Sequence, residues 1–300
     1  MKALVAKDYG DVDQLELREM PEPPVGPDDV KVRVAAASIN PIDWKLLSGA
    51  RRKLMELHFP AILGRDASGE VLAVGANVKA FQRGDRVLGL VMGAFAEQVT
   101  ANQNAWALLP SGLDALDAAA LPLVTLTGAQ LAERVEPAKG RTILVTGALG
   151  GVGRATVFVA KSAGATVFAG VRKSQKQAAM SLGADRVIAL DDDAELAAVP
   201  ELDGIADTVN GETIAKLLPR IKKGGHLGSV VGEPAGARER GLQVKAMLTQ
   251  PDSKRLEELA RAVAAKKLII PVEKRFPLAQ APDAIRLARG GGVGKVLVLP

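Results

Sequence analysis

Apolar and polar positions follow a strand-like pattern over the first third of the chain. From Met1 to about Pro110, short apolar runs are separated by turn residues, a pattern typical of β-strands. The prolines at 21–27 cannot lie in a central strand, so they mark a surface connection. We therefore expect an all-β, barrel-like module with strands at 2–7, 15–20, 29–38, 69–74, 86–90 and 96–100.

The pattern changes from about Leu113, where helical segments begin to alternate with apolar strands. This alternation predicts a parallel sheet covered by helices on both faces. Helices are expected at 115–119, 124–134, about 152–163, 174–182, 213–221 and 253–266, with strands at 142–146, 166–170, 204–211 and 224–232. The tail returns to short strands at 269–273 and 294–299. We therefore expect an α/β chain with a β-module at 1–112 and 267–300 and a doubly wound parallel sheet at 113–266.

A glycine-rich turn joins the strand at 142–146 to the next helix. Glycines let the main chain approach a pyrophosphate closely, and the helix beginning near Val152 directs unpaired N–H groups at the anion. Ala148 stands where such a motif normally has its first glycine, so a tight turn without a ligand is the alternative. The strand–helix–strand context favours a nucleotide site. The expected contacts are Gly147, Ala148, Gly150, Gly151, Val152 and Gly153.

The charges after this turn point to the phosphorylated coenzyme. No carboxylate occurs between Glu136 and Asp185, although an NAD site normally has an acid about 20 residues after its glycines. Cations and a hydroxyl that could hold a 2′-phosphate follow the second strand instead, namely Arg172, Lys173, Ser174 and Lys176. A solvated helix start is the alternative, but three cations unanswered by carboxylates would oppose the helix dipole. The predicted cofactor is NADPH.

Composition limits the remaining classes. A chain of 300 residues with 48% hydrophobic content should hold two domains. No uncharged apolar run reaches about 18 residues, and the amino end lacks a signal-peptide pattern, so we expect a cytoplasmic protein without a membrane segment. The absence of cysteine excludes disulfides, thiolate catalysis and a cysteine zinc site, and two histidines, His58 and His226, make a histidine-rich metal site improbable.

A formal charge of +5 and a pI near 9.4 raise nucleic-acid binding as a rival hypothesis. The cations are spread along the chain, and aromatic residues make up only 3% of it, which leaves little to stack on bases. Nucleic acid is therefore disfavoured as a partner. We interpret the positive charge as an attractive field for an anionic cofactor.

Several short segments, in this order and spacing, carry a resemblance along nearly the whole chain. They are Ser38-Ile-Asn-Pro-Ile-Asp-Trp-Lys45, Gly64-Arg-Asp-Ala-Ser-Gly-Glu-Val71, Phe81-Gln-Arg-Gly-Asp-Arg-Val87, Gly93-Ala-Phe-Ala-Glu97, Ala119-Ala-Leu-Pro122, the glycine turn and Gly294-Lys-Val296. The chain resembles the zinc-independent quinone oxidoreductase branch of the medium-chain dehydrogenase/reductase superfamily. This resemblance implies a GroES-like β-barrel domain joined to a Rossmann domain, and a homodimer is expected because such reductases commonly form one.

The departures from zinc-dependent relatives shape the expected chemistry. Those relatives have Gly-His-Glu where this chain has Gly64-Arg65-Asp66, and they carry a cysteine-rich lobe that this chain lacks. Without that Lewis acid, simple alcohol oxidation is disfavoured. The resemblance implies instead that NADPH delivers a hydride to a quinone or to an α,β-unsaturated carbonyl. The site would then contribute mainly orientation and exclusion of water.

The resemblance also implies candidate site residues. Asn40 could hydrogen-bond the cofactor or the acceptor oxygen, and Asp43 with Lys45 could orient the same loop or relay a proton. The alternative is a structural turn with a surface ion pair. Trp44 stands where many relatives have a tyrosine, so no tyrosine acid is proposed, and Asp66 is expected to tie the β-module together. Further coenzyme contacts implied by the resemblance are Thr127, Val209, Asn210, Val231, Gly232 and Lys295.

Two other functional classes compete with this hypothesis. A short-chain reductase would need a Tyr-x-x-x-Lys dyad, but the single tyrosine is Tyr9, outside the nucleotide-binding segment. An NADPH-binding structural or regulatory protein, crystallin-like or RNA-associated, is the remaining alternative, because the sequence shows no clear acid or base.

Overall fold

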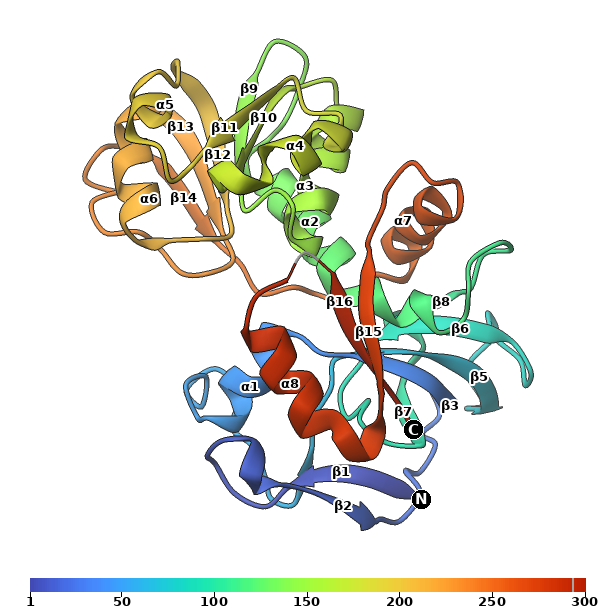
Figure 1. Ribbon diagram of the computed structural model, residues 1–300. Coiled ribbons are helices and arrows are strands. Elements are labelled where there is room, and N and C mark those ends of the chain that lie inside the picture. Colours follow the sequence, from blue (N-terminus) through green and yellow to red (C-terminus); the bar gives the residue numbers. More distant parts are fainter. Residues whose placement is uncertain (293) are drawn as a thin grey trace. The chain divides into compact units, whose positions relative to one another are not determined.

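The chain folds into two compact units in a computed structural model that describes residues 1–292 and 294–300 (Figure 1). The first unit combines Met1–Leu123 with Pro251–Pro300, and the second is Val124–Gln250. The sequence placed the corresponding divisions at 112/113 and 266/267. The difference concerns mainly the helix α7 (Ser253–Ala264), which packs against the strand β8 (Trp106–Leu108) of the first unit. A periodic apolar face shows that α7 is buried on one side but not which core it covers.

The first unit is built on two β-sheets. The larger sheet has the order β15-β16-β3-β5-β6-β8, with β7 also paired to β3, and the smaller has the order β2-β1-β4. The strands are β1 (Lys2–Ala6), β2 (Leu15–Glu19), β3 (Asp29–Ser38), β4 (Ala61–Ile62), β5 (Asp66–Val74), β6 (Arg86–Leu90), β7 (Gln98–Asn102), β15 (Val272–Pro277) and β16 (Lys295–Leu299). Helices α1 (Pro41–Leu47) and α8 (Ala281–Arg289) complete the unit together with α7.

Strand alternation explains how this sheet forms. In β3, Val30, Val32 and Val34 are buried, while the intervening Lys31 and Arg33 are not, as expected for a strand with one face on the core. The carboxyl-terminal strand β16 pairs antiparallel with β3 through Leu297 opposite Ser38, so both ends of the chain contribute to one sheet (Figure 1).

The second unit contains six parallel strands in the order β11-β10-β9-β12-β13-β14. Counted from β9, this is the order 3-2-1-4-5-6 of the Rossmann fold. The strands are β9 (Thr142–Thr146), β10 (Thr166–Val171), β11 (Arg186–Ala189), β12 (Leu202–Asp207), β13 (Ile221–Ser229) and β14 (Gln243–Ala246). The helices are α2 (Pro122–Arg134), α3 (Gly151–Ser162), α4 (Lys176–Ala179), α5 (Asp193–Ala197) and α6 (Gly211–Leu217), with α2 beginning two residues before the unit.

Side chains of successive residues in the central strands pack into two separate hydrophobic cores. Val145 and Val167 join the core that includes residues of α2 and α3, whereas Leu144 and Phe168 join the core that includes α5 and α6. Because neighbouring residues of a strand point to opposite faces, the sheet is covered on both sides, as the sequence predicted.

Several expected elements differ in detail. The helix expected at 115–119 is a 3-10 turn at Asp117–Ala120, and the strand expected at 204–211 lies at Leu202–Asp207. The helix expected at 174–182 is divided into short 3-10 turns at Lys173–Gln175 and Met180–Leu182 around the four-residue α4. The helix expected at 213–221 stops earlier, because a 3-10 turn with Pro219 leads directly into β13. The strand expected at 269–273 lies at 272–277. None of the helices in residues 1–292 and 294–300 has the length and hydropathy of a membrane span.

Candidate functional site

The glycine turn between β9 and α3 is an open backbone cradle. Gly147 adopts a left-handed conformation with φ +63°, and Gly150 is the N-cap of α3, where no side chain caps the helix. Gly150 is exposed, and a Cβ there would meet only the Gly147 oxygen, at 3.3 Å. The first N–H groups of this 12-residue helix therefore have no side-chain acceptor in the described part of the chain, which suits an anionic ligand.

The other glycines of the turn serve close packing. A Cβ on Gly153 would lie 2.3 Å from the Gly147 oxygen, and one on Gly147 would lie 2.3 Å from Thr208 Oγ1. Ala148 is fully buried, and its N–H donates to the Gly170 oxygen at 3.0 Å, which ties the turn to the end of β10. The side chain of Ala148 therefore belongs to the interior, which explains how alanine replaces the usual glycine.

A buried carboxylate, Asp207, joins the carboxyl ends of three adjacent strands. It accepts hydrogen bonds from Thr146 Oγ1 at 2.8 Å and Ser229 Oγ at 3.1 Å, and from the N–H groups of Val209 and Asn210, each at 3.1 Å. These contacts fix the ends of β9, β12 and β13 at the edge where open parallel sheets bind ligands. The sequence pattern did not single out Asp207 as a site residue, although it closes an apolar strand.

The predicted contacts at 209–210 and 231–232 meet at the same edge. Asn210 Nδ2 donates to the Val231 oxygen at 3.4 Å, and the Val231 N–H donates to Ser229 Oγ at 3.2 Å. A Cβ on Gly232 would lie 3.8 Å from Asn210 Nδ2. The structure thus brings these four residues together with the glycine turn.

Thr127 lies on α2, which packs directly on α3. A Cβ on Gly128 would lie 2.5 Å from the Val152 oxygen, so the two helix backbones are in close contact at the start of α3. The Thr127 hydroxyl is 2.6 Å from that of Thr249, and only 6% of Thr127 is exposed. Thr127 therefore lies on the helix beside the glycine turn, with one hydroxyl partner already in place.

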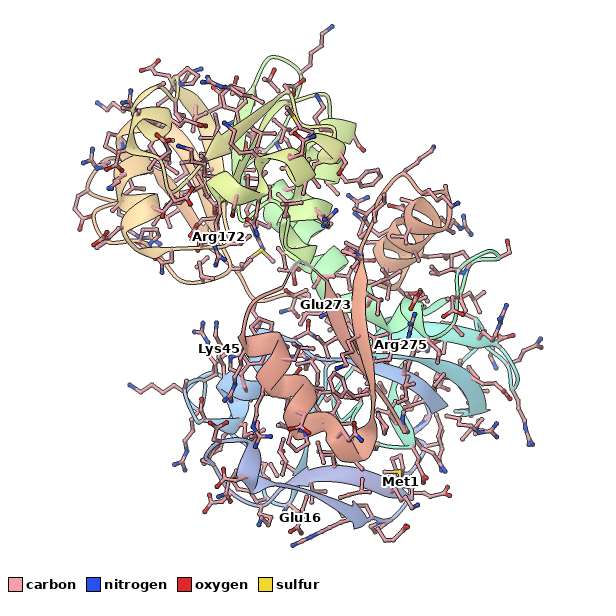
Figure 2. All side chains as sticks on the ribbon, in the orientation of Figure 1. Met1, Glu16, Lys45, Arg172, Glu273 and Arg275 are labelled. Carbon is pink, nitrogen blue, oxygen red and sulfur yellow. The ribbon has the colours of Figure 1, made fainter. Side chains whose placement is uncertain are left out.

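The prediction that no carboxylate answers the cations after β10 is wrong. Lys173 Nζ lies 3.0 Å from Asp192 Oδ2, and Lys176 Nζ lies 2.7 Å from Glu195 Oε1. Arg172, labelled in Figure 2, is exposed and has no carboxylate within 4.0 Å in the described part of the chain. Ser174 is also exposed.

The carboxylates were missed because they follow the next strand. β10 and β11 run parallel with Val171 opposite Ala189, so the segments after them share one edge of the sheet. The run of acids that begins at Asp191 is thereby placed beside Lys173. An acidic run after a parallel strand is the signal that could have revealed this pairing.

A second polar cluster lies inside the first unit, around Asn40. Asn40 Nδ2 donates to Asp66 Oδ2 at 2.8 Å, while Lys295 Nζ donates to Asn40 Oδ1 at 2.6 Å and to the Ile39 oxygen at 2.8 Å. Asp66 also accepts from Ser38 Oγ at 2.6 Å and from the N–H of Leu123 at 2.7 Å. These contacts confirm that Asp66 ties the module together. They also occupy both polar atoms of the Asn40 side chain.

Asp43 is buried in the same cluster rather than paired at the surface. Its Oδ2 accepts from the Asn40 N–H at 2.7 Å, and its buried Oδ1 has no hydrogen-bond partner among the residues that the structure describes. Burial raises the pKa of Asp43 to about 7, with the Asn40 N–H opposing and Asp66 adding to the rise. Burial also lowers the pKa of Lys295 and raises that of Asp66. The sequence alternative of a surface ion pair between Asp43 and Lys45 is therefore wrong.

Lys45 is half-buried on α1 (Figure 2), and its ammonium has no ion-pair partner among residues 1–292 and 294–300. Burial lowers its pKa, and Arg51 adds to the effect. Arg65, at the position of the histidine in zinc-dependent relatives, donates its Nε–H to the Val91 oxygen at 2.9 Å. The part of the chain that the structure describes contains no group of three or more His, Asp or Glu side chains arranged to hold a metal ion.

The buried state of Asp43 predicts a pH dependence of stability. Its folded pKa of about 7 exceeds the ordinary value of 3.8, so folding takes up a proton between these pH values. We expect the contribution of Asp43 to stability to be fully present below the unfolded pKa and to be lost as pH rises to about 7, on the order of 4 kcal/mol at roughly 1.4 kcal/mol per pH unit. We expect Asp43→Asn to remove this slope, measured by urea unfolding at pH 5, 6, 7 and 8. Parallel pH profiles of the two proteins would contradict it.

Comparisons with known proteins agree with this architecture. The family profile "Alcohol dehydrogenase GroES-like domain" matches residues 26–111, and "Zinc-binding dehydrogenase" matches residues 182–298. The chloroplast envelope quinone oxidoreductase homolog of Arabidopsis thaliana is 30% identical, over 100% of this chain and 98% of that protein. An NADPH-dependent alkenal/one oxidoreductase of the same plant is 31% identical, over 100% of this chain and 80% of that protein.

A solved structure shows the same fold over the full length. The quinone oxidoreductase from Coxiella burnetii superposes with a TM-score of 0.90 at 29% identity, covering 100% of this chain and 99% of that one. The chain therefore belongs to the quinone oxidoreductase branch of the medium-chain dehydrogenase/reductase superfamily, a family of NAD(P)-dependent oxidoreductases.

Proposed function

We propose that this chain is an NADPH-dependent reductase of quinones or α,β-unsaturated carbonyls. The observation that carries the proposal is the glycine turn, whose exposed Gly150 leaves the first N–H groups of α3 open beside the fixed strand ends. A Cβ at residue 150 would fill this cradle, so the residues present fit a dinucleotide pyrophosphate. When bound, NADPH supplies the hydride. The relatives named for quinones and for alkenals support the two acceptor classes.

The chain would contribute binding and orientation. The N–H groups at the start of α3 would hold the pyrophosphate, and Gly147, Gly151, Val152 and Gly153 would shape the turn around it. The strand-end segments with Val209, Asn210, Val231 and Gly232 would position the rest of the coenzyme, and the hydroxyl of Thr127 would contact it from α2. Fixed strand ends suit this task, because Asp207 holds three of them without a ligand.

For proton handling we propose the loop that contains Asn40, Asp43 and Lys45. Asn40 and Lys295 are bonded to each other and to their neighbours, so their first role is to hold this loop. Lys45 of the same loop is half-buried and has a lowered pKa. Its ammonium has no ion-pair partner among the described residues. It therefore suits proton donation to a reduced acceptor better than Asn40.

An acceptor panel tests the function. NADPH oxidation would be followed with benzoquinones, naphthoquinones, enals and enones, beside matched saturated aldehydes as controls. We expect oxidation with the electron-poor acceptors and none with the saturated compounds. A structural or regulatory NADPH-binding protein would change the fluorescence of NADPH yet oxidise none of it, and that result would favour the alternative.

We propose NADPH rather than NADH as the preferred coenzyme, with Arg172 as the main determinant and Lys173, Ser174 and Lys176 as further contacts. Because Arg172 is free of carboxylates in the described residues and Lys173 is not, the two cations should contribute unequally. We expect Arg172→Gln to weaken NADPH binding roughly ten- to hundredfold, since a charge-assisted bond contributes about 1.5–3 kcal/mol. Calorimetry of both coenzymes checks this.

The matched control is Lys173→Gln, for which the expected loss of NADPH affinity is smaller. NADH binding should change little in both variants, because an unphosphorylated ribose offers no anion to these side chains. Equal losses for NADPH and NADH would place the 2′-phosphate site elsewhere. The cytoplasmic location and the homodimer expected from the sequence stay predictions.

A further inference from the structure

We propose that the acidic segment after β11, through Asp192 above all, limits the preference for the phosphorylated coenzyme by holding Lys173 away from a 2′-phosphate. The inference rests on the proposed coenzyme site and concerns residues that the glycine motif and the cations after β10 do not include. It makes Asp192 a residue that determines coenzyme specificity from the neighbouring strand.

The carboxylates of this segment are fixed by backbone contacts. Asp192 Oδ1 caps α5 by accepting from the N–H groups of Ala194 at 3.1 Å and Glu195 at 3.2 Å. Glu195 Oε2 accepts from the N–H of Ala189 at 2.8 Å. Asp191 Oδ1 accepts from the N–H of Lys173 at 2.6 Å. The acids therefore stay in place, while the lysines that meet them have long flexible side chains.

Two of the three cations after β10 are paired with carboxylates of this segment. Lys173 pairs with Asp192 and Lys176 with Glu195, while Asp191 accepts from the Lys173 N–H. The hydrogen bond with Asp192 raises the pKa of Lys173 and lowers that of Asp192, as expected for an ion pair. The sequence alone suggested an uncompensated group of three cations. In the structure, Arg172 is the cation without such a partner among residues 1–292 and 294–300.

A 2′-phosphate has to compete with these carboxylates, but a bare ribose does not. To bind the phosphate, Lys173 must leave Asp192, and the phosphate must approach the fixed negative charge of Asp192. Neither effect applies to NADH, because its ribose carries hydroxyl groups only. Neutralising Asp192 should therefore strengthen binding of the phosphorylated coenzyme and leave that of the other unchanged.

The test compares Asp192→Asn with the neighbouring Asp193→Asn. Asparagine caps helices about as well as aspartate, so α5 should keep its start. Asp193 pairs with Lys216 at 2.6 Å rather than with the cations after β10, and its side chain is 80% exposed, so it controls for loss of one charge from the same segment. Calorimetry would measure the dissociation constants of 2′,5′-ADP and 5′-AMP at one fixed ionic strength. Thermal unfolding would confirm that both variants are folded.

We expect Asp192→Asn to bind 2′,5′-ADP roughly three- to tenfold more tightly, the range of a partly exposed ion pair with an added repulsion. Affinity for 5′-AMP should stay within about twofold, and Asp193→Asn should match the unmodified protein for both nucleotides. Should Asp192→Asn lower the melting temperature, Glu195→Gln releases Lys176 and gives the same comparison.

Three results would overturn the inference. Unchanged binding of 2′,5′-ADP in the Asp192 variant would show that Lys173 is not withheld, and weaker binding would show that Asp192 presents Lys173 to the phosphate. An unmodified protein that binds neither nucleotide would overturn the coenzyme site itself, and this inference with it. If the unmodified protein binds both nucleotides, the coenzyme site stands, and a failure in the Asp192 variant then concerns this inference alone.

Discussion

Replacing Gly150 with alanine is expected to weaken binding of NADPH and NADH together, roughly ten- to hundredfold, with little change in stability. The added methyl group would occupy the open side of the turn and keep a pyrophosphate from the N–H groups of α3. The apo protein should tolerate it, because the backbone of Gly150 has φ −69° and the nearest atom is the Gly147 oxygen at 3.3 Å. Calorimetry of both coenzymes beside thermal unfolding measures the two effects.

Gly153→Ala is the matched control within the same turn. Its Cβ would lie 2.3 Å from the Gly147 oxygen and 2.6 Å from Ala148 Cα, so the backbone itself would have to move. We expect this variant to lose about 1–3 kcal/mol of folding stability, as overpacked interiors do. If Gly150→Ala binds coenzyme normally, the pyrophosphate does not lie in the open cradle. If it unfolds as readily as Gly153→Ala, the turn is not open at residue 150.

The second large effect is expected for Lys295→Met, which should destabilise the protein by about 3–5 kcal/mol. The change removes the ammonium that donates to Asn40 Oδ1 and to the Ile39 oxygen. It also leaves the buried Asp66 carboxylate without the Lys295 cation, whose Nζ lies 4.0 Å from Asp66 Oδ2 in the intact protein. Urea unfolding at fixed pH gives the free energy. The size follows from an uncompensated buried charge rather than from the intrinsic value of the pair.

The double variant Asp66→Asn/Lys295→Met separates these contributions. Removing both charges should recover part of the loss, because neither ion is then buried alone. The cluster is not coupled as its distances indicate if the losses of unfolding free energy from the two single variants simply add in the double variant. A loss below about 1 kcal/mol of unfolding free energy for Lys295→Met would show the same.

The elements most readable from the sequence were those with a local cause. The strands Asp29–Ser38 and Arg86–Leu90 were predicted with their observed bounds, because the first alternates apolar and polar residues and the second is a short apolar run between turns. The turn before α3 was equally readable, since glycines placed between a strand and a helix have few other uses. The lengths of the apolar segments and their periodicity were therefore enough to predict the fold class.

What could not be read depends on partners distant in sequence. The pairing of Lys173 with Asp192 requires the parallel register of β10 and β11, and the cluster around Asn40 includes Lys295, which lies 255 residues away in the chain. The sequence placed α7 with the parallel sheet, whereas it packs on the first unit. An amphipathic pattern predicts that one face of a helix is buried but not which surface it contacts. Short elements such as α1 and β14 were missed for lack of a sustained period.

The position of β16 affects the order in which the protein can assemble during synthesis. Lys295 is made 256 residues after Ile39, whose carbonyl it binds, and the second half of β3 lacks one neighbour until β16 emerges from the ribosome. The parallel sheet, by contrast, is formed by one uninterrupted stretch of the chain. The parallel-sheet unit can therefore form during synthesis before the first unit is complete, since Asp66 lacks its counterion until Lys295 has been made.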